Sequence, residues 1–515
     1  MENLKYTAVE FKFIERFEEN FRLIDIVGKS SLNHLLIHNF CDAVEKQDNR
    51  IISSNIYDEI WGIETPIIIQ GSIDYHTAIS IFEKTWKIIT RTCRFWIEDH
   101  IQEEYRWRQA WRLWENHAFS VVVVHAESLS LLYDKLESAW LEHRWISVNW
   151  QGESSSISGI NAIAWSGMDR NLQFTGIESQ LNFESIDRFY EKLNRKLEHY
   201  FIQKGEYLNI IELIQRLLTC KEILNNSNYK PIRSYSIQNL LMNCDLERTN
   251  NQLWTGWFQG GGDRITQYIR KMTIQEQNKI KNLQNFSNTI NQWIKQSLKP
   301  SLSEILGQII YAKRDEFLSI FDYPGQLNLS SYECLEWLYD FNSERKSSIW
   351  KQHGQPITIS ASFIWAAAGI RQQYVLRHCR EAQQSAKQKG GDRLALRVLF
   401  KSGNYLEWIC PWWFLQPVLE GYRDRSGQKN WRHIYTDIAQ LESRHAFSGK
   451  DSEVALGLFQ IYFGFDNRSI LEKYLWETEG KAGILGNDRH DCSNSHQAID
   501  NWIIKLAKIG FHLCQ

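Results

Sequence analysis

GQIIYAKRDEFLSIF, residues Gly307–Phe321, consists of two short apolar runs on either side of a charged centre. Isoleucine and phenylalanine favour β-strands, and two such runs around a tight polar centre are typical of a β-hairpin. The turn presents Asp315 and Glu316, and paired carboxylates can hold the metal ions that phosphoryl transfer requires. A solvated turn has the same pattern, so both interpretations remain open from this stretch alone.

The length and composition are those of an ordinary globular chain. With 515 residues, roughly three or four domains are expected. Hydrophobic residues make up 43% of the chain and charged residues 23%, which excludes a disordered chain. The formal net charge of -2 excludes a bulk nucleic-acid binder with a basic surface, so any RNA contact must be local or shared with partners.

The cysteines and the absence of long apolar runs predict a cytoplasmic protein. Nine cysteines occur without any Cys-x-x-Cys pair, which indicates a reducing compartment and argues against a thiolate metal site. No apolar run approaches the roughly 20 residues of a membrane helix, and the N-terminus has no signal-peptide pattern. We expect no membrane partner.

Strand and helix patterns occur twice in the order strand, helix, two strands, helix, strand, which is that of a ferredoxin-like domain. In the first half they lie at Lys5–Phe11, a helix to about Ala43, Ile51–Ser54, Pro66–Gly71, Tyr75–His100 and Phe119–Val124. In the second half they lie at Trp254–Gln259, Ile265–Lys295, the opening hairpin, Tyr332–Phe341 and Pro356–Phe363, followed by a helix at Ile370–Gln388 and a strand at Leu394–Phe400.

These patterns predict an α+β protein with two ferredoxin-like βαββαβ domains. The expected domains are the first ferredoxin-like domain at 1–128, a mostly helical insertion at 129–250, the second ferredoxin-like domain at 251–402 and a C-terminal helical bundle at 403–515. In the insertion the helical pattern runs from Ile186 to Leu224, and beyond Leu406 the chain is expected to be mostly helical. The tryptophans of Trp408–Arg425 and Trp431–Arg444 suit either protein and RNA contact or a tryptophan-rich core.

Three further positions bear on the hairpin carboxylates. Asp263 ends the first strand of the second domain, where it could join Asp315 and Glu316 or act as a helix N-cap. Lys387 stands one turn before the Gly390–Arg393 segment, at the end of an amphipathic helix, where it could face the phosphates of a nucleotide or lie in solvent. The following Gly390–Arg393 segment is typical of a helix C-cap.

Several segments resemble the large subunit of type III CRISPR effector complexes, in particular the type III-B branch. They are WQGESSSISGINAIAW (150–165), WTGWFQGGGDR (254–264), GQIIYAKRDEFL (307–318), QHGQPITISASFIWAAAGI (352–370), HCREAQQSAKQKGGDRLALRVLF (378–400) and NYLEWICPWWFLQPVLEGYR (404–423). The resemblance implies two palm domains, of which the second is GGDEF-like and related to nucleotidyl cyclases. It also implies a role in antiviral defence, with other effector subunits, CRISPR RNA and target RNA as partners.

The sequence departs from the family pattern at the positions that carry its chemistry. The central Gly-Gly-Asp-Asp turn of the family corresponds here to Lys313, Arg314, Asp315 and Glu316, and its two first-strand aspartates fall on Gly261 and Asp263. Active members join ATP into cyclic oligoadenylates when target RNA is bound. Glycines allow close approach of the triphosphate, whereas Lys313 and Arg314 obstruct it and can pair with the two acids.

The zinc knuckle and the nuclease of the family are also expected to be missing. The positions of the cysteine pair hold Ser155 and Ser158, and serine hydroxyls are poor zinc ligands, so no zinc is expected. The first palm begins at about residue 5, which leaves no room for the N-terminal His-Asp nuclease domain.

The resemblance and its departures together predict a scaffold subunit without cyclase or nuclease activity and without a required cofactor. Two alternatives remain open. The first is an active cyclic oligoadenylate synthase with a diverged turn, which would use Asp263, Asp315 and Glu316 to hold magnesium and would bind ATP. The second is a free-standing nucleotide-sensing protein.

Overall fold

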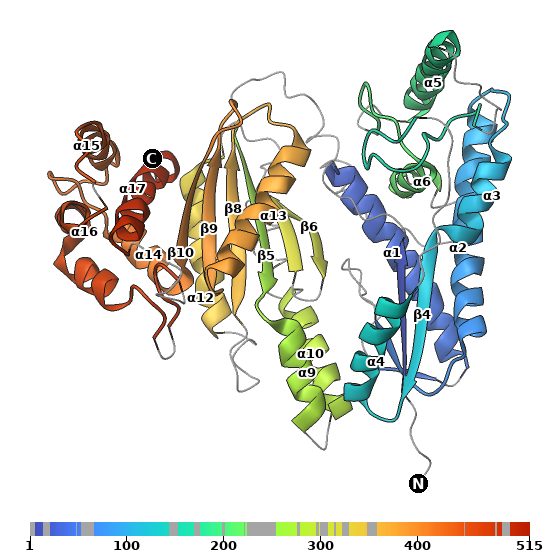
Figure 1. The fold of residues 1–515 in the computed structure, drawn as a ribbon, viewed down its shortest axis with the longest axis horizontal. Helices are drawn as coiled ribbons and strands as arrows, with labels where there is room; N and C mark the ends of the chain where they lie inside the picture. The colour runs from blue at the N-terminus through green and yellow to red at the C-terminus, as the bar shows by residue number, and fades with distance from the viewer. Residues whose placement is uncertain are drawn as a thin grey trace. The chain divides into compact units, whose positions relative to one another are not determined.

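The computed structural model describes most of the chain. The described residues are 6–13, 21–47, 49–52, 66–143, 153–168, 176–197, 201–220, 222–223, 254–275, 279–294, 298, 307–313, 316–321, 329–347, 358–447, 449–478, 481–486 and 495–514. The chain divides into two compact units, Met1–Glu247 with Thr266–Thr289 and Arg248–Ile265 with Ile290–Gln515. Within the described ranges each unit contains one β-sheet (Figure 1).

The sheet of the first unit has the strand order β2-β3-β1-β4. Its elements in chain order are β1 (Tyr6–Phe13), α1 (Leu23–Glu45), β2 (Arg50–Ile51), β3 (Ile67–Gln70), α2 (Tyr75–His100), α3 (Arg108–His117) and β4 (Phe119–Ala126). The central strand β1 pairs antiparallel with β3 and β4. The predicted ferredoxin-like order is confirmed, with the short helix α3 as an addition that the sequence did not predict.

Successive side chains of β1 point to opposite faces of the first sheet, and different helices cover the two faces. The ring of Phe11 lies 5.0 Å from that of Phe82 in α2, and Phe82 stacks on Phe40 of α1 at 4.4 Å. The neighbouring Glu10 accepts a hydrogen bond from Trp140 of α4 (Leu129–Glu142). Because successive strand residues point to opposite faces, α1 and α2 cover one face of the sheet and α4 the other.

The insertion of the first unit is less helical than predicted. It contains α5 (Gly176–Lys196) and α6 (Ile210–Leu217), and residues 201–209 before α6 are not helical. Asn209 begins α6 as its N-cap and forms a capping box with Glu212. The continuous helical pattern predicted from Ile186 to Leu224 is therefore wrong, because a capping box starts a new helix in its middle.

The sheet of the second unit has six strands in the order β10-β9-β8-β5-β7-β6. They are β5 (Thr255–Gly262), β6 (Gly307–Lys313), β7 (Glu316–Phe321), β8 (Ile359–Ala366), β9 (Arg393–Leu399) and β10 (Tyr405–Pro411). The helices α9 (Ile265–Gln275) and α10 (Lys279–Trp293) lie between β5 and β6 in the chain, and α12 (Ser331–Ser347) precedes β8. The predicted hairpin is confirmed, because β6 and β7 pair antiparallel up to Lys313 and Glu316.

The second ferredoxin-like order is also confirmed, but the sheet continues beyond it. β9 pairs parallel with β8, and β10 pairs antiparallel with β9. The prediction of helix from Leu406 was wrong, since Tyr405–Pro411 is a strand. Gly403 has φ 82°, and Phe400 N–H donates to Asn404 O, so a tight turn closes a β9–β10 hairpin.

The rest of the C-terminal region is mainly helical, as predicted. It contains α14 (Trp412–Gly421), α15 (Arg432–Ser443), α16 (Glu453–Lys473) and α17 (Ser495–Leu513). Trp408, Trp412 and Trp431 are buried, which favours the tryptophan-rich core over a contact surface for these three residues. None of the helices in the described ranges combines the length and apolar character of a bilayer span.

Successive side chains of β5 point to opposite faces of the second sheet, and a different helix packs on each face. The ring of Phe258 packs on Trp337 and Phe341 of α12, at 5.3 and 5.1 Å. The adjacent Gln259 donates to Gln383 of α13 (Gln372–Gln388). Figure 1 shows α13 crossing the face of the sheet that holds this second contact. The residues at the end of β5 therefore meet the last turns of α13.

Candidate functional site

Gly261, Glu316 and Lys387 come together at one end of the second sheet. A Cβ atom added to Gly261 would lie 3.4 Å from Cγ of Glu316 and 3.5 Å from Nζ of Lys387. The register explains this, because Gly260 pairs with Phe317 and so sets Gly261 beside the first residue of β7.

Part of the predicted turn lies outside the described residues. This holds for Arg314 and Asp315, and of Lys313 only the backbone is described, paired with Glu316. The site as described therefore consists of the end of β5, the start of β7 and the last turns of α13.

Gln383 occupies the space in front of Gly261. Its Nε2 atom lies 2.8 Å from the position of a Cβ added there, and its Oε1 atom accepts a 3.0 Å hydrogen bond from Gln259. Gln383 is buried, so any side chain at position 261 would displace it. Sequence reasoning missed this residue, although it stands four positions before Lys387 on the same helix face.

Both carboxylate oxygens of Asp263 accept hydrogen bonds within the protein. Its Oδ2 atom accepts from the hydroxyl of Thr358 at 2.7 Å and from the backbone N–H of Asp392 at 2.9 Å. Its Oδ1 atom accepts from the hydroxyl of Ser360 at 2.6 Å. These bonds join the end of β5 to the start of β8 and to the turn before β9. They give Asp263 a structural role that neither sequence interpretation included.

The glycine-rich turn after α13 ends the helix, as predicted. Gly391 N–H donates to Ala386 O and Gly390 N–H to Lys387 O, with φ of 83° and 111° at the two glycines. The turn also closes over Asp263, since a Cβ added to Gly391 would lie 2.8 Å from Oδ2 of Asp263. Its Asp392 N–H is one of the three donors to Asp263, a role the sequence did not reveal.

The described residues do not fit a magnesium site. Magnesium needs several oxygen ligands in near-octahedral arrangement. Gly261 supplies none, both oxygens of Asp263 already accept hydrogen bonds, and the ammonium of Lys387 lies near Gly261. In the part of the chain that the structure describes, no three His, Cys, Asp or Glu side chains form a group that could hold a metal.

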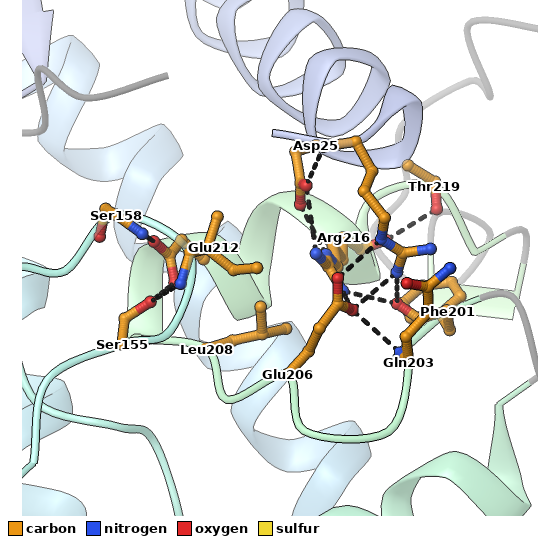
Figure 2. A network of polar contacts seen from close by, with 12 residues as sticks. Asp25, Ser155, Ser158, Phe201, Gln203, Glu206, Leu208, Glu212, Arg216 and Thr219 are labelled. Carbon is orange, nitrogen blue, oxygen red and sulfur yellow. Dashed lines mark hydrogen bonds and ion pairs between the residues drawn. The ribbon is translucent and has the colours of Figure 1, made fainter. Parts of the chain in front are cut away.

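The zinc-knuckle positions in the first unit form a hydrogen-bonded cluster around Glu212 (Figure 2). Ser155 donates its hydroxyl proton to Oε2 of Glu212, and the backbone N–H of Ser158 donates to Oε1 at 3.1 Å. Burial raises the pKa of Glu212 above its usual range, against the opposing effect of these hydrogen bonds. The cluster contains no thiolate and its hydroxyl groups already have partners, so these residues do not fit a zinc ion.

A buried ion network lies next to this cluster (Figure 2) and joins α6 to α1. Arg216 is fully buried and binds Asp25 of α1 at 2.6 Å and Glu206 at 2.7 Å. Arg22 pairs with the same Glu206 at 2.8 Å, and Phe201 O accepts from both arginines. The carboxylates raise the pKa of Arg216 despite its burial, so the guanidinium is charged. The network thereby fixes α6 of the insertion to α1.

No family model matches this sequence, and no curated protein matches it. A chain of the type III-B Cmr-beta complex, solved by cryo-EM in the apo state, aligns with a TM-score of 0.56 and 9% identity. This alignment covers 99% of the present chain and 82% of that chain.

Two further structures align more weakly. For the type III-B Cmr-beta bound to cognate target RNA, the TM-score is 0.49 and the identity 8%, over 88% of this chain and 78% of that one. The Csm1–Csm4 subcomplex of the type III-A CRISPR-Csm interference complex aligns with a TM-score of 0.46 and 10% identity. This alignment covers 99% of this chain and 70% of that chain. These two add nothing to the assignment, which depends on the apo Cmr-beta chain. The chain thus has the fold found in type III-B Cmr-beta, the fold that its sequence motifs predicted.

Proposed function

We propose that this protein is the large scaffold subunit of a type III RNA-guided effector complex, without cyclic oligoadenylate synthesis. The fold that it shares with Cmr-beta supports the place in the complex. The residues around Gly261 support the loss of chemistry. The partners are the other effector subunits, CRISPR RNA and target RNA, and the biological role is antiviral defence.

The observation that carries this proposal is the filled space in front of Gly261. Gln383 lies within 2.8 Å of the point where a metal-binding side chain at 261 would begin, and Lys387 follows at 3.5 Å. A positive charge next to Gly261 disfavours a divalent cation at the same place, because like charges repel. Asp263 is stabilised by three neutral donors and does not need a metal to offset its charge.

The scaffold role is tested by purifying the tagged full-length chain from cells that carry the neighbouring CRISPR genes. We expect sister subunits and nuclease-protected CRISPR RNA to copurify with it in fixed ratio. Recovery of the chain alone from these cells would contradict the scaffold role and favour a free-standing protein.

The loss of chemistry is tested by titrating the purified chain with ATP and magnesium in a calorimeter. We expect no magnesium-dependent binding of ATP by the unaltered chain or by Asp315→Ala. Binding that requires magnesium and is lost in Asp315→Ala would instead support the active synthase.

A further inference from the structure

Two exposed tyrosines lie at the end of the second sheet opposite the Gly261 site. Tyr374 in the first turn of α13 is 52% exposed, and Tyr405 at the start of β10 is 48% exposed. Residues at the two ends of β8 are about 23 Å apart, so the tyrosines are remote from Lys387 and Glu316. A nucleotide held at the Gly261 site would therefore lie too far from the two tyrosines to contact them.

The ring of Tyr405 rests on a fixed cation. The guanidinium carbon of Arg397 lies over this ring, 4.2 Å from its centroid. Arg397 is buried and donates to Glu407 and, at 3.1 Å, to Glu381, so its guanidinium cannot rotate freely. A cation on one face of an aromatic ring is attracted to its π-electrons and holds the ring in place. The part of the Tyr405 side chain that stays exposed is available to a ligand.

His378 completes the support of this ring. Its own ring contacts Tyr405 edge-on with 5.1 Å between centroids. Burial, together with Arg397, lowers the pKa of His378, so the neutral imidazole accepts a 2.6 Å hydrogen bond from Arg397. Tyr374 stands four residues before His378 on α13, which puts the two side chains on one face of the helix. Both tyrosines therefore belong to one surface.

Positively charged side chains flank the two tyrosines. Arg371, the N-cap residue of α13, and Lys401, in the β9–β10 turn, are exposed. A Cβ added to Gly369 would lie 3.5 Å from Cε of Lys401, so the loop before α13 and the β9–β10 turn are neighbours. The two carboxylates nearby, Glu381 and Glu407, both bind Arg397.

We propose that Tyr374 and Tyr405, with Arg371 and Lys401, form a stacking surface for single-stranded RNA. Unpaired bases stack on exposed aromatic rings, and arginine and lysine beside the rings bind the phosphates. Duplex bases are already stacked on each other, so the surface discriminates against duplex RNA. The choice of RNA as the ligand rests on the proposed function, whereas the surface itself rests on the geometry of the four residues.

The test measures binding of a fluorescein-labelled 20-nucleotide RNA of mixed sequence to the full-length chain by anisotropy, beside the same RNA in duplex form. Tyr405→Leu and Tyr374→Leu should each weaken single-strand binding by about fivefold or more, because stacking contributes about 1–3 kcal/mol per base. Tyr405→Phe should bind like the unaltered chain, since it keeps the ring. Melting temperatures of all variants establish that they fold.

Phe95→Leu is the matched control, because Phe95 on α2 is 51% exposed and its ring lies 5.0 Å from the guanidinium of Arg94. It should leave the affinity unchanged. The surface is wrong if the folded tyrosine-to-leucine variants bind as tightly as the unaltered chain, if Phe95→Leu weakens binding equally, or if the unaltered chain binds no single-stranded RNA. None of these results affects copurification with sister subunits, which tests the proposed function separately.

Discussion

Asp263 shows how a carboxylate at the end of a central strand can serve packing. Two hydroxyls and one backbone N–H donate to it, and they come from β8 and from the turn before β9. A metal-binding carboxylate must keep oxygen lone pairs for the ion, and carboxylates gathered around a metal repel one another in its absence. The two roles therefore predict opposite effects of removing the side chain.

Replacing Asp263 by alanine should lower the free energy of unfolding of the second unit by about 1–3 kcal/mol, because it leaves partly buried donors without an acceptor. Urea unfolding followed by tryptophan fluorescence measures this change. Asp340→Ala, at an exposed position of α12, is the control and should have little effect. A more stable Asp263→Ala protein would indicate that the carboxylate is held in place for a metal.

His34 on α1 predicts how the stability of the first unit depends on pH. Burial, with a further contribution from His38, lowers the pKa of His34 from 6.5 to about 4. Between these values the unfolded chain binds more protons than the folded chain, so stability falls as the pH decreases from 6.5 toward 4.

In His34→Gln, the melting temperature should fall less between pH 7 and pH 5 than in the unaltered chain, because the titrating group is gone. His38→Gln, one turn along the same helix, should keep most of the decrease, because His34 is still present. Equal slopes in the unaltered chain and in His34→Gln would show that His34 does not titrate in this range.

At the scale of elements, the ion network around Arg216 fixes α6 to α1. Removing one member of a buried ion group leaves the other charges without compensation, which costs about 3–5 kcal/mol. Arg216→Ala should therefore strongly destabilise the first unit, as measured by thermal unfolding. Arg195→Ala removes a pair whose side chains are 77% and 69% exposed and should change stability little. Similar melting temperatures for the two variants would refute the anchoring role.

The contact between β5 and α13 predicts a cost for an aspartate at position 261, because Gln383 must move to admit it. Gly261→Asp should lower the melting temperature, because the new side chain meets Gln383 at 2.8 Å, and added magnesium should not raise it. Gly261→Asp with Gln383→Ala should recover part of the loss. A magnesium-dependent rise in the melting temperature of Gly261→Asp alone would show that the space is available.

Elements defined by local patterns could be predicted from the sequence, and contacts between distant segments could not. The β6–β7 hairpin follows from two apolar runs, and Tyr75–His100 was predicted with its final bounds because its apolar spacing is helical. β10 was missed because a tryptophan-rich apolar run suits a buried strand and a buried helix equally. Gln383 contacts Gln259 across 124 positions, and no local signal encodes such a pairing.

At the scale of the whole molecule, the fold and the chemistry depend on different residues. The likeness to the Cmr-beta chain extends over 99% of this chain at 9% identity, so the fold persists while most residues differ. Catalysis, in contrast, depends on a few side chains. The same fold can therefore persist when the residues of a site, such as those at positions 261 and 387, change.

Incubating the purified complex with ATP, magnesium and target RNA, followed by mass spectrometry of the products, measures whether the complex synthesises cyclic oligoadenylate. We expect no cyclic oligoadenylate, from the unaltered complex and from a complex with Asp315→Ala alike. Cyclic oligoadenylate that requires target RNA and magnesium, and that disappears with Asp315→Ala, would contradict this expectation.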